Sequence, residues 1–302
     1  MSNWSGKSRG GASGYRFFIF LIKHTCLKGV YFFIRIVAFY FLLFSKKAPI
    51  YFYFRKIHSY KRLKTIKSIY QNYCLLGEVL VDKIMVLSGM KPRFTYSFEG
   101  EEFLQEMSNE GKGGILIGAH IGNWEMAGQL LDRIDTRVNI VMLEAEHEKI
   151  TKVLQDVFVN RSINIIPQKD DYSHLFKISE AFKKNEFVVI HGDRYMPDTN
   201  TITTSFLGKP AKFPSGPLYL ASKNNVPVTF VYTVKDSATH YHFYATPGKV
   251  FPYPSNMKTR KQNITGMVES YVSSLENIVK KYPLQWFNYY HFWEDETINN
   301  GT

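Results

Sequence analysis

The sequence contains little cysteine and no motif for a covalent enzyme intermediate. Cys26 and Cys74 are the only cysteines among 302 residues, so neither a disulfide framework nor a thiolate metal site can be built. No Gly-x-Ser-x-Gly elbow joins a strand candidate to a helix, and neither cysteine has the local setting of a nucleophile. We therefore expect no covalent enzyme intermediate and no metal site.

Acidic residues are absent from the N-terminal quarter of the chain. Residues 1–67 contain 14 Lys and Arg and no Asp or Glu, so the formal net charge of +12 originates there. A nucleic-acid binder can concentrate charge in this way, but its basic segments are not usually interleaved with so much aliphatic and aromatic surface. A membrane surface fits better, and no nucleic acid is expected as a partner.

The N-terminal apolar segment lacks a long uncharged run. Residues 15–44 are mostly apolar, yet the longest uncharged stretch covers residues 36–45, whereas a spanning helix needs about 20 apolar residues. On a helical wheel the polar residues of this segment fall within an arc of roughly 140°. They are Arg16, Lys23, His24, Lys28 and Arg35. We predict a helix that lies in the membrane interface or enters it at a slant, with a buried core helix as the alternative.

Composition divides the chain into three parts. Residues 1–14 are rich in Gly and Ser and are predicted to be a disordered tail. Residues 15–64 are predicted to form a basic amphipathic membrane anchor, and residues 65–302 a single catalytic domain. A cleaved signal peptide is not expected, because charges repeatedly interrupt the apolar region and no small-x-small site follows it.

Strand and helix patterns alternate along the catalytic domain. Apolar periodicity predicts helices over residues 65–90 and 260–281. Nearly continuous β-branched runs predict strands that are covered on both faces. The strand candidates are residues 114–118, 138–143, 163–166, 187–190, 226–232 and 241–245. The predicted fold is α/β, with a mixed, mostly parallel sheet flanked by helices.

A histidine and a carboxylate meet where the first of these strands ends. His120 and Glu125 lie in Gly-Ala-His-Ile-Gly-Asn-Trp-Glu, between a strand and a helix-compatible stretch. Five residues along one continuous helix would place the two side chains about 140° apart, so His120 must precede the helix and Gly122 must let the backbone turn. Such a pair is suited to proton transfer. The alternative is a helix-capping histidine and an ordinary first-turn acid.

Beyond Glu125, further sequence motifs follow in a fixed order. The region that contains them ends at Trp293. Residues 188–194 read Val-Val-Ile-His-Gly-Asp-Arg, residues 203–211 contain Phe-Leu-Gly-Lys-Pro, and a Gly-led helix and the apolar Val-Pro-Val at 226–228 come next. Together with the His-x4-Glu signature, these blocks resemble the bacterial lipid A late acyltransferase family, part of the H-x4-D/E lysophospholipid acyltransferase superfamily. Asp193 matches the family, whereas Arg194 stands where the family has glutamine.

The resemblance implies an acyltransferase that moves a fatty acyl chain from an acyl carrier protein or coenzyme A thioester to a lipid hydroxyl, with no other cofactor. A 3-hydroxyacyl chain of a lipid A precursor is the leading acceptor. The Arg194 departure leaves open a lysophospholipid, a glycine or ornithine lipid, or an aryl polyene or flexirubin-type pigment. In this scheme His120 is the general base and Glu125 orients its ring, while Asp193 supports catalysis or anchors hydrogen bonds.

Four further residues are predicted to bind substrate. Arg161 and Arg194 offer planar donors that match phosphate and carboxylate, although a solvated arginine at a helix end is the alternative for Arg161. Asn123 and Lys209 lie inside the matching blocks. The loop over residues 206–217 either lines an acyl channel or is a stiff connection. The aromatic residues 282–293 either reach headgroup depth or pack as a closing segment.

The expected partners are membrane lipids and acyl carrier protein. The basic stretch at residues 55–64 can bind an anionic leaflet or an acidic carrier protein, and the sequence does not separate these roles. The expected location is the inner (plasma) membrane with the catalytic domain facing the cytoplasm, and a monomer is favoured. A membrane scaffold that kept the fold without activity is the alternative outside the enzymes.

Overall fold

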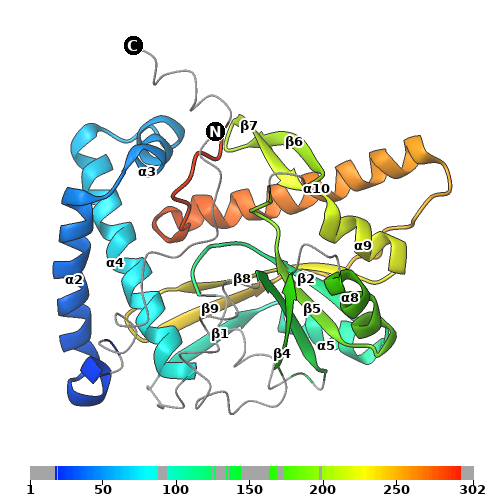
Figure 1. Ribbon diagram of the computed structural model, residues 1–302, viewed down its shortest axis with the longest axis horizontal. Helices are drawn as coiled ribbons and strands as arrows, with labels where there is room; N and C mark the ends of the chain where they lie inside the picture. The colour runs from blue at the N-terminus through cyan, green and yellow to red at the C-terminus, as the bar shows by residue number, and fades with distance from the viewer. Residues whose placement is uncertain are drawn as a thin grey trace.

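One seven-stranded sheet organises the protein (Figure 1). The computed structural model describes residues 18, 20–87, 94–123, 126, 134, 136–143, 163–168, 173–196 and 199–293. The strand order is β1-β9-β8-β2-β5-β3-β4, and only the β8–β9 pair is antiparallel. The strands are β1 Thr95–Glu99, β2 Gly114–Gly118, β3 Val138–Leu143, β4 Ile163–Gln168, β5 Phe187–His191, β8 Val228–Lys235 and β9 His240–Ala245. The predicted α/β fold with a mixed, mostly parallel sheet is confirmed.

Local pattern located six of these strands and missed β1. The bounds of β2 and β3 are those predicted, and β4, β5, β8 and β9 differ from the prediction by a few residues at their ends. In β1, Thr-Tyr-Ser-Phe-Glu, the end residues are exposed and the middle ones only partly buried, because the strand lies at the sheet edge. This segment carries no continuous apolar run, and so gives a weak sequence signal.

Both faces of the sheet are covered, as the apolar runs predicted. Ile115 and Ile117 of β2 pack in the main core, which includes Leu275 of α10, whereas Leu116 between them packs with Leu104 of α5 on the opposite face. This division follows from the alternation of side chains along a strand. The helices of the domain are α5 Glu101–Asn109, α8 Ser173–Lys183, α9 Gly216–Asn224 and α10 Met257–Lys281, and a short 3-10 turn, η3 Pro283–Gln285, follows.

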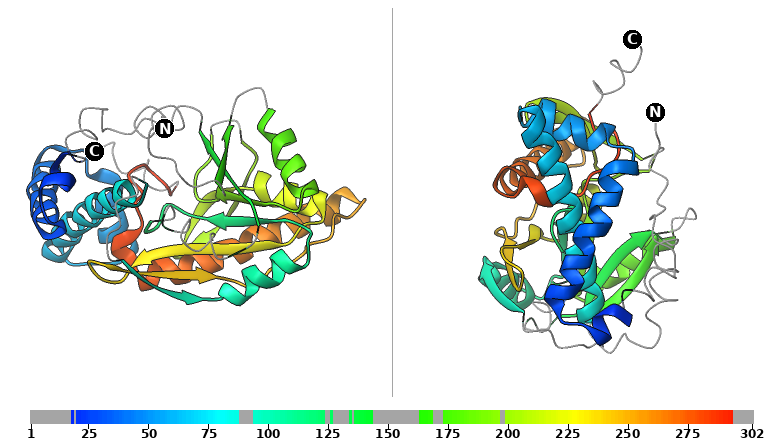
Figure 2. Two further views of the ribbon diagram at one scale, coloured as in Figure 1. Left: turned by 90° about the horizontal axis from the view of Figure 1, so that it is seen from below. Right: turned by 90° about the vertical axis from the view of Figure 1, so that its left-hand side faces the viewer.

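Residues 27–87 form a helical layer at one end of the molecule (Figure 2). It comprises α2 Leu27–Phe44, α3 Ala48–Phe52, the π-helical η1 Tyr53–Ile57 and α4 Arg62–Leu87. A helical stretch that ends at His24 precedes α2, and the chain leaves helical geometry at Thr25 and Cys26. The wheel drawn over residues 15–44 therefore describes two helical segments rather than one.

Helix α2 packs against α4 through one face. Val30, Tyr31 and Ile34 are buried in a small core with Val81 and Ile84 of α4. Large apolar side chains cover the rest of the helix and are exposed. They are Phe32, Ile36, Phe39, Tyr40, Leu43 and Phe44. Among the described residues α2 is the one helix long and apolar enough to cross a membrane, with 18 residues and a mean hydropathy of 1.8.

A buried polar cluster joins this helical layer to the sheet. Lys235 of β8 donates to the carboxylate of Asp82 in α4 and, at 2.8 Å, to the hydroxyl of Tyr31 in α2. Asp82 also accepts from the hydroxyls of Tyr31 and Tyr241. Further along, Phe54 of η1 is fully buried in the main core. Part of the predicted anchor thus packs with the catalytic domain, and the division at residue 64 stays a prediction.

Candidate active site

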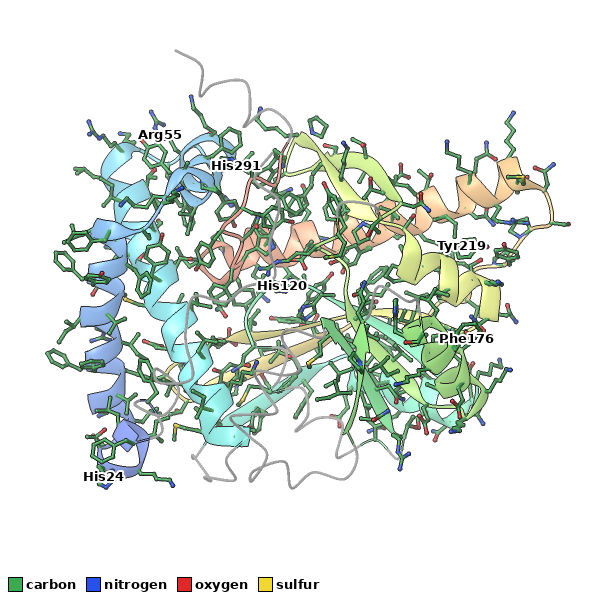
Figure 3. The ribbon with its side chains drawn as sticks, viewed as in Figure 1. His24, Arg55, His120, Phe176, Tyr219 and His291 are labelled. Atoms are coloured by element: carbon green, nitrogen blue, oxygen red, sulfur yellow. The ribbon has the colours of Figure 1, made fainter. Side chains whose placement is uncertain are left out.

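The predicted histidine and aspartate lie together at the carboxyl edge of the sheet. Strands β2 and β5 are parallel neighbours, and Gly118 at the end of β2 pairs with His191 at the end of β5. His120 lies two residues after Gly118, and Asp193 lies two residues after His191. The register of β2 and β5 therefore brings His120 and Asp193 together. This is the edge at which open α/β sheets bind ligands. Figure 3 shows His120 near the centre of the view.

Asp193 holds His120 through two hydrogen bonds. The Nδ1 atom of His120 lies 2.7 Å from Oδ1 of Asp193, and the backbone N–H of His120 donates to Oδ2 at 3.0 Å. Because an ionised carboxylate only accepts hydrogen bonds, the geometry assigns the proton to Nδ1 and leaves a lone pair on Nε2. The histidine side chain is 24% exposed and the aspartate side chain 2%, so the pair has one accessible member.

The environment keeps Asp193 ionised. Burial alone would raise the pKa of its carboxyl, but the charge of His120, the hydrogen bond from His120 and the nearby Arg194 outweigh burial and hold the pKa well below its usual value. The indole N–H of Trp286 also donates to Oδ2, at 3.2 Å. Asp193 is therefore a charged acceptor that fixes the ring of His120.

A second histidine, to which the sequence motifs assign no role, completes the site. The Nδ1 atom of His191 lies 3.3 Å from Nε2 of His120, and the two ring centroids are 4.3 Å apart. Burial, together with the charge of His120, lowers the pKa of His191 well below 6.5, so its ring is neutral at pH 7. The one available signal was its place two residues before Asp193 at a strand end.

The C-terminal segment closes over the loop that carries His120. The backbone N–H of Phe287 donates to the carbonyl of His120 at 2.8 Å, and Ile121 forms a β-bridge with Trp286. Trp286 is 1% exposed and Trp293 is 2% exposed. Of the two interpretations of residues 282–293, the structure thus favours a packed closing segment.

Gly122 makes the predicted turn after His120. Its φ of +62° lies in the left-handed region, and its backbone N–H donates to the carbonyl of Gln285 at 2.9 Å. A Cβ atom at this position would lie only 1.9 Å from the carbonyl oxygen of Thr233 in β8. Only glycine permits both this conformation and this approach.

Three other predicted site residues are described in the structure, and each contacts a different part of the fold. Asn123 is fully buried, and its amide nitrogen donates to the carbonyl of Val79 at 3.2 Å, which ties it to α4 rather than to the site. Arg194 follows Asp193 and donates from Nη2 to the carbonyl of Phe287 at 2.9 Å. The ammonium of Lys209 lies 5.9 Å from the ring centroid of Phe52 in α3. Their roles in substrate binding stay predictions. Glu125 and Arg161 lie outside the described residues.

The predicted loop over residues 206–217 is largely a β-hairpin. Strands β6 Thr201–Phe206 and β7 Lys209–Pro214 pair antiparallel, and Leu207 and Gly208 join them with φ angles of 53° and 81°. Two central residues with positive φ are typical of a type I′ turn. Phe206 and Phe213 are fully buried in the main core. This packing fits a stiff connection, and an acyl channel at this loop stays a prediction.

One group of side chains in the described part of the chain has metal-binding geometry. Donor atoms of His120, His191 and Asp193 lie within 4.8 Å of one another. Oδ1 of Asp193 already accepts from His120, so the hydrogen-bonded arrangement accounts for all three side chains without an ion. The prediction of a metal-free site stays a prediction.

The fold and the site define an α/β protein with a histidine–aspartate pair placed for general base chemistry at the carboxyl edge of a sheet. The sequence profile of the family "Bacterial lipid A biosynthesis acyltransferase" matches residues 54–294, and the chain belongs to this family. The protein is thus a lipid acyltransferase. A search of curated proteins finds no match.

Among solved structures the chain is similar to the 1-acyl-sn-glycerophosphate (LPA) acyltransferase PlsC from Thermotoga maritima. The identity is 14%, the TM-score is 0.37, and the similarity covers 82% of this chain and 97% of that one. The family assignment rests on the profile match.

Proposed function

We propose that the protein transfers a fatty acyl chain from an acyl carrier protein thioester to the hydroxyl of a 3-hydroxyacyl chain in a lipid A precursor. Coenzyme A is the alternative donor. The observation that carries the proposal is the 2.7 Å contact between His120 and Asp193 at the carboxyl edge of the sheet, in a chain of the lipid A acyltransferase family.

The proposed reaction proceeds without a covalent enzyme intermediate. Nε2 of His120 takes the proton of the acceptor hydroxyl while the hydroxyl oxygen attacks the thioester carbonyl carbon. The tetrahedral oxyanion then collapses, the C–S bond breaks, and the thiolate leaves with the proton that His120 held. The products are the acyl ester and the free thiol of the donor. Asp193 stabilises the imidazolium, because it accepts from Nδ1 as an ionised carboxylate.

The proposed roles of the two carboxylates differ from the first expectation. The motif predicts that Glu125 orients the ring, but the contact described in the structure is made by Asp193. We assign ring orientation to Asp193, and the role of Glu125 stays a prediction from the family motif. Arg194 packs beside this pair and bonds the closing segment, so we treat it as a support for the site.

The outer face of α2 is the proposed membrane-docking surface. An 18-residue helix is about 27 Å long, slightly less than the roughly 30 Å hydrocarbon core, and one face is already buried on α4. A helix with one face on protein and exposed Phe32, Phe39 and Phe44 on the other suits an interfacial position. We propose the inner membrane, with the catalytic domain facing the cytoplasm where acyl carrier protein is found.

Acyl transfer by purified protein tests the proposed function. Wild-type, His120→Ala and Asp193→Asn proteins would each receive a radiolabelled acyl carrier protein thioester, or acyl coenzyme A, with a total membrane lipid extract. We expect a labelled lipid with wild-type protein, and a loss of about 10²-fold or more with His120→Ala. Equal labelling by His120→Ala and wild type would contradict the general base role.

The identity of the labelled lipid tests the acceptor. Mass spectrometry of a labelled lipid A precursor would support the leading choice. A labelled lysophospholipid, amino-acid lipid or polyene pigment would replace that choice and leave the chemistry intact. If neither donor labels any lipid, the membrane scaffold becomes the better explanation.

Substitutions on α2 test the membrane surface separately. Replacing exposed Phe39 and Phe44 by serine should lower the fraction of protein that sediments with anionic lipid vesicles, while transfer to a detergent-solubilised acceptor stays near the wild-type rate. Unchanged sedimentation would argue against this surface.

A further inference from the structure

His191 contacts the atom of His120 that matters for proton transfer. The ring of His191 meets the ring of His120 at an interplanar angle of 67°, and its Nδ1 atom points at Nε2 across 3.3 Å. Nε2 is the nitrogen that the acceptor hydroxyl must reach, because Asp193 occupies Nδ1. A polar neighbour at this position therefore acts on the base itself.

The protons that the two histidine rings carry decide which ring donates the hydrogen bond. Asp193 accepts at Nδ1, so neutral His120 carries its single proton there and a lone pair on Nε2. Two ring nitrogens attract each other only when one has a proton and the other a lone pair. For neutral His120, the proton between Nε2 and the second ring therefore belongs to Nδ1 of His191. That ring needs only one proton, which agrees with the lowered pKa of His191.

We propose that His191 is a positioning residue that donates from Nδ1 to Nε2 of His120 and so keeps His120 in its base tautomer until the acceptor hydroxyl takes the place of this bond. The inference rests on the proposed general base role of His120. With Asp193 on one nitrogen and His191 on the other, rotation of the imidazole ring and exchange of its tautomer both lose a hydrogen bond. The base is thus ready before the lipid binds.

The backbone around His191 holds it in register with His120. Gly192 N–H donates to the carbonyl of Gly118 at 2.9 Å, and Tyr271 donates to the same carbonyl at 2.9 Å. A Cβ atom at Gly192 would lie 2.8 Å from Ile117, so β2 and the end of β5 approach closely. A Cβ atom at Gly118 would come within 3.4 Å of the His191 ring, which therefore packs over the glycine.

The charged groups around His191 favour its neutral form. Burial lowers the pKa of His191 most, and the charge that His120 carries when it is protonated lowers it further, as do the smaller effects of Arg194 and Lys83, whereas Asp193 acts in the opposite direction. A charged His191 would place a second cation beside the imidazolium that forms during the reaction. A neutral His191 with its proton on Nδ1 can donate to Nε2 of His120 without this repulsion.

A pair of substitutions of similar size separates donation from packing. In His191→Asn the side-chain N–H can donate from about the position of Nδ1, whereas in His191→Leu no donor remains. We expect Asn to keep kcat within about threefold of wild type and Leu to lower it by about tenfold, with KM changed less than kcat. Equal kcat values for the two variants would overturn the proposal, and thermal unfolding checks that both proteins fold.

Nitrogen-15 NMR of histidine-labelled wild-type protein gives a readout that a packing role would not produce. We expect the neutral ring of His191 as the Nδ1–H tautomer, with Nδ1 of His120 protonated as well. An Nε2–H tautomer of His191 would overturn the proposal. His120→Ala in the transfer assay keeps the two hypotheses apart: an active His120→Ala protein contradicts the proposed function, whereas an inactive one with equal Asn and Leu variants contradicts only the role of His191.

Discussion

At the scale of single residues, the site depends on which carboxylate reaches His120. The motif drew attention to Glu125, five residues along the chain, yet the described hydrogen bonds come from Asp193, whose sequence separation from His120 is 73 residues. Both residues were predicted as catalytic, because both match the motif blocks that resemble the acyltransferase family. The hydrogen bond between His120 and Asp193, and the presence of His191 beside it, depend on strand register and could not be predicted from either motif alone.

Asp193→Asn should reduce kcat by about 10²–10⁴-fold, because an amide can neither stabilise an imidazolium nor fix the Nδ1–H tautomer as a carboxylate does. Steady-state acyl transfer measures the effect. Trp286→Phe serves as the milder comparison, since it removes the 3.2 Å bond to Oδ2 of Asp193 and part of the buried indole but leaves the carboxylate. A kcat for Asp193→Asn within threefold of wild type would show that Asp193 does not support the base.

His58 should make the protein less stable in acid. Burial, with a smaller effect of Lys64, lowers the pKa of His58 from 6.5 to about 4. Between these values the unfolded chain binds a proton that the folded chain does not, so the free energy of unfolding falls as the pH drops from 6.5 toward 4 and is insensitive to His58 above 6.5.

Urea unfolding at pH 7 and pH 5 measures this dependence. His58→Phe should lose less stability between the two pH values than wild type, because the ring stays packed against Tyr53 and Tyr60 but no longer titrates. The same loss in both proteins would mean that other groups cause the acid sensitivity.

At the scale of elements, glycine decides whether the loop after β2 can reach its neighbours. Gly122 combines a positive φ with a close approach to the carbonyl of Thr233. The glycine spacing in the motif predicted the turn, whereas the contact with β8 appears only in the folded chain. The β6–β7 hairpin illustrates the opposite case: its turn uses Leu207 at positive φ, which the sequence does not indicate, and the segment was predicted as a loop.

Gly122→Ala should destabilise the protein by at least about 1–3 kcal/mol, the usual cost of a strained backbone, because the new Cβ meets a backbone carbonyl. It should also lower kcat, since the displaced loop carries His120. Gly216→Ala in α9 is the matched control, because nothing lies within 4 Å of its Cβ position and its φ is not positive. Thermal unfolding and kcat would be compared, and equal melting temperatures for the two variants would contradict the expected clash.

At the scale of the whole molecule, the helical layer and the sheet form one connected structure. Lys235 and Asp82 are buried, with side chains 2% and 0% exposed, and Tyr31 brings α2 into the same cluster. The backbone of Lys235 also exchanges hydrogen bonds with the side chain of Gln285, which precedes Trp286 at the active site. Helix α2 is thus linked to the segment that closes the site.

Lys235→Met should destabilise the protein by about 3–5 kcal/mol, because it leaves the carboxylate of Asp82 buried without its cation. The double variant Lys235→Met with Asp82→Leu should recover part of that loss. Lys184→Met, which breaks an exposed pair with Glu180, should leave the stability nearly unchanged. Urea unfolding measures all three, and a double variant less stable than Lys235→Met would argue against an uncompensated buried charge.

The sequence by itself determined the elements and the chemistry that the strand ends can carry. Apolar runs and helical periodicity are local properties, so β2, β3 and α10 could be placed within a few residues, and the motif blocks identified the acyltransferase family. The tertiary structure decided which side chains meet. Pairing of Gly118 with His191 sets His120 against Asp193 and His191, and long-range packing sets Trp286 against Asp193. Such contacts join residues far apart in the chain, and no local pattern specifies them.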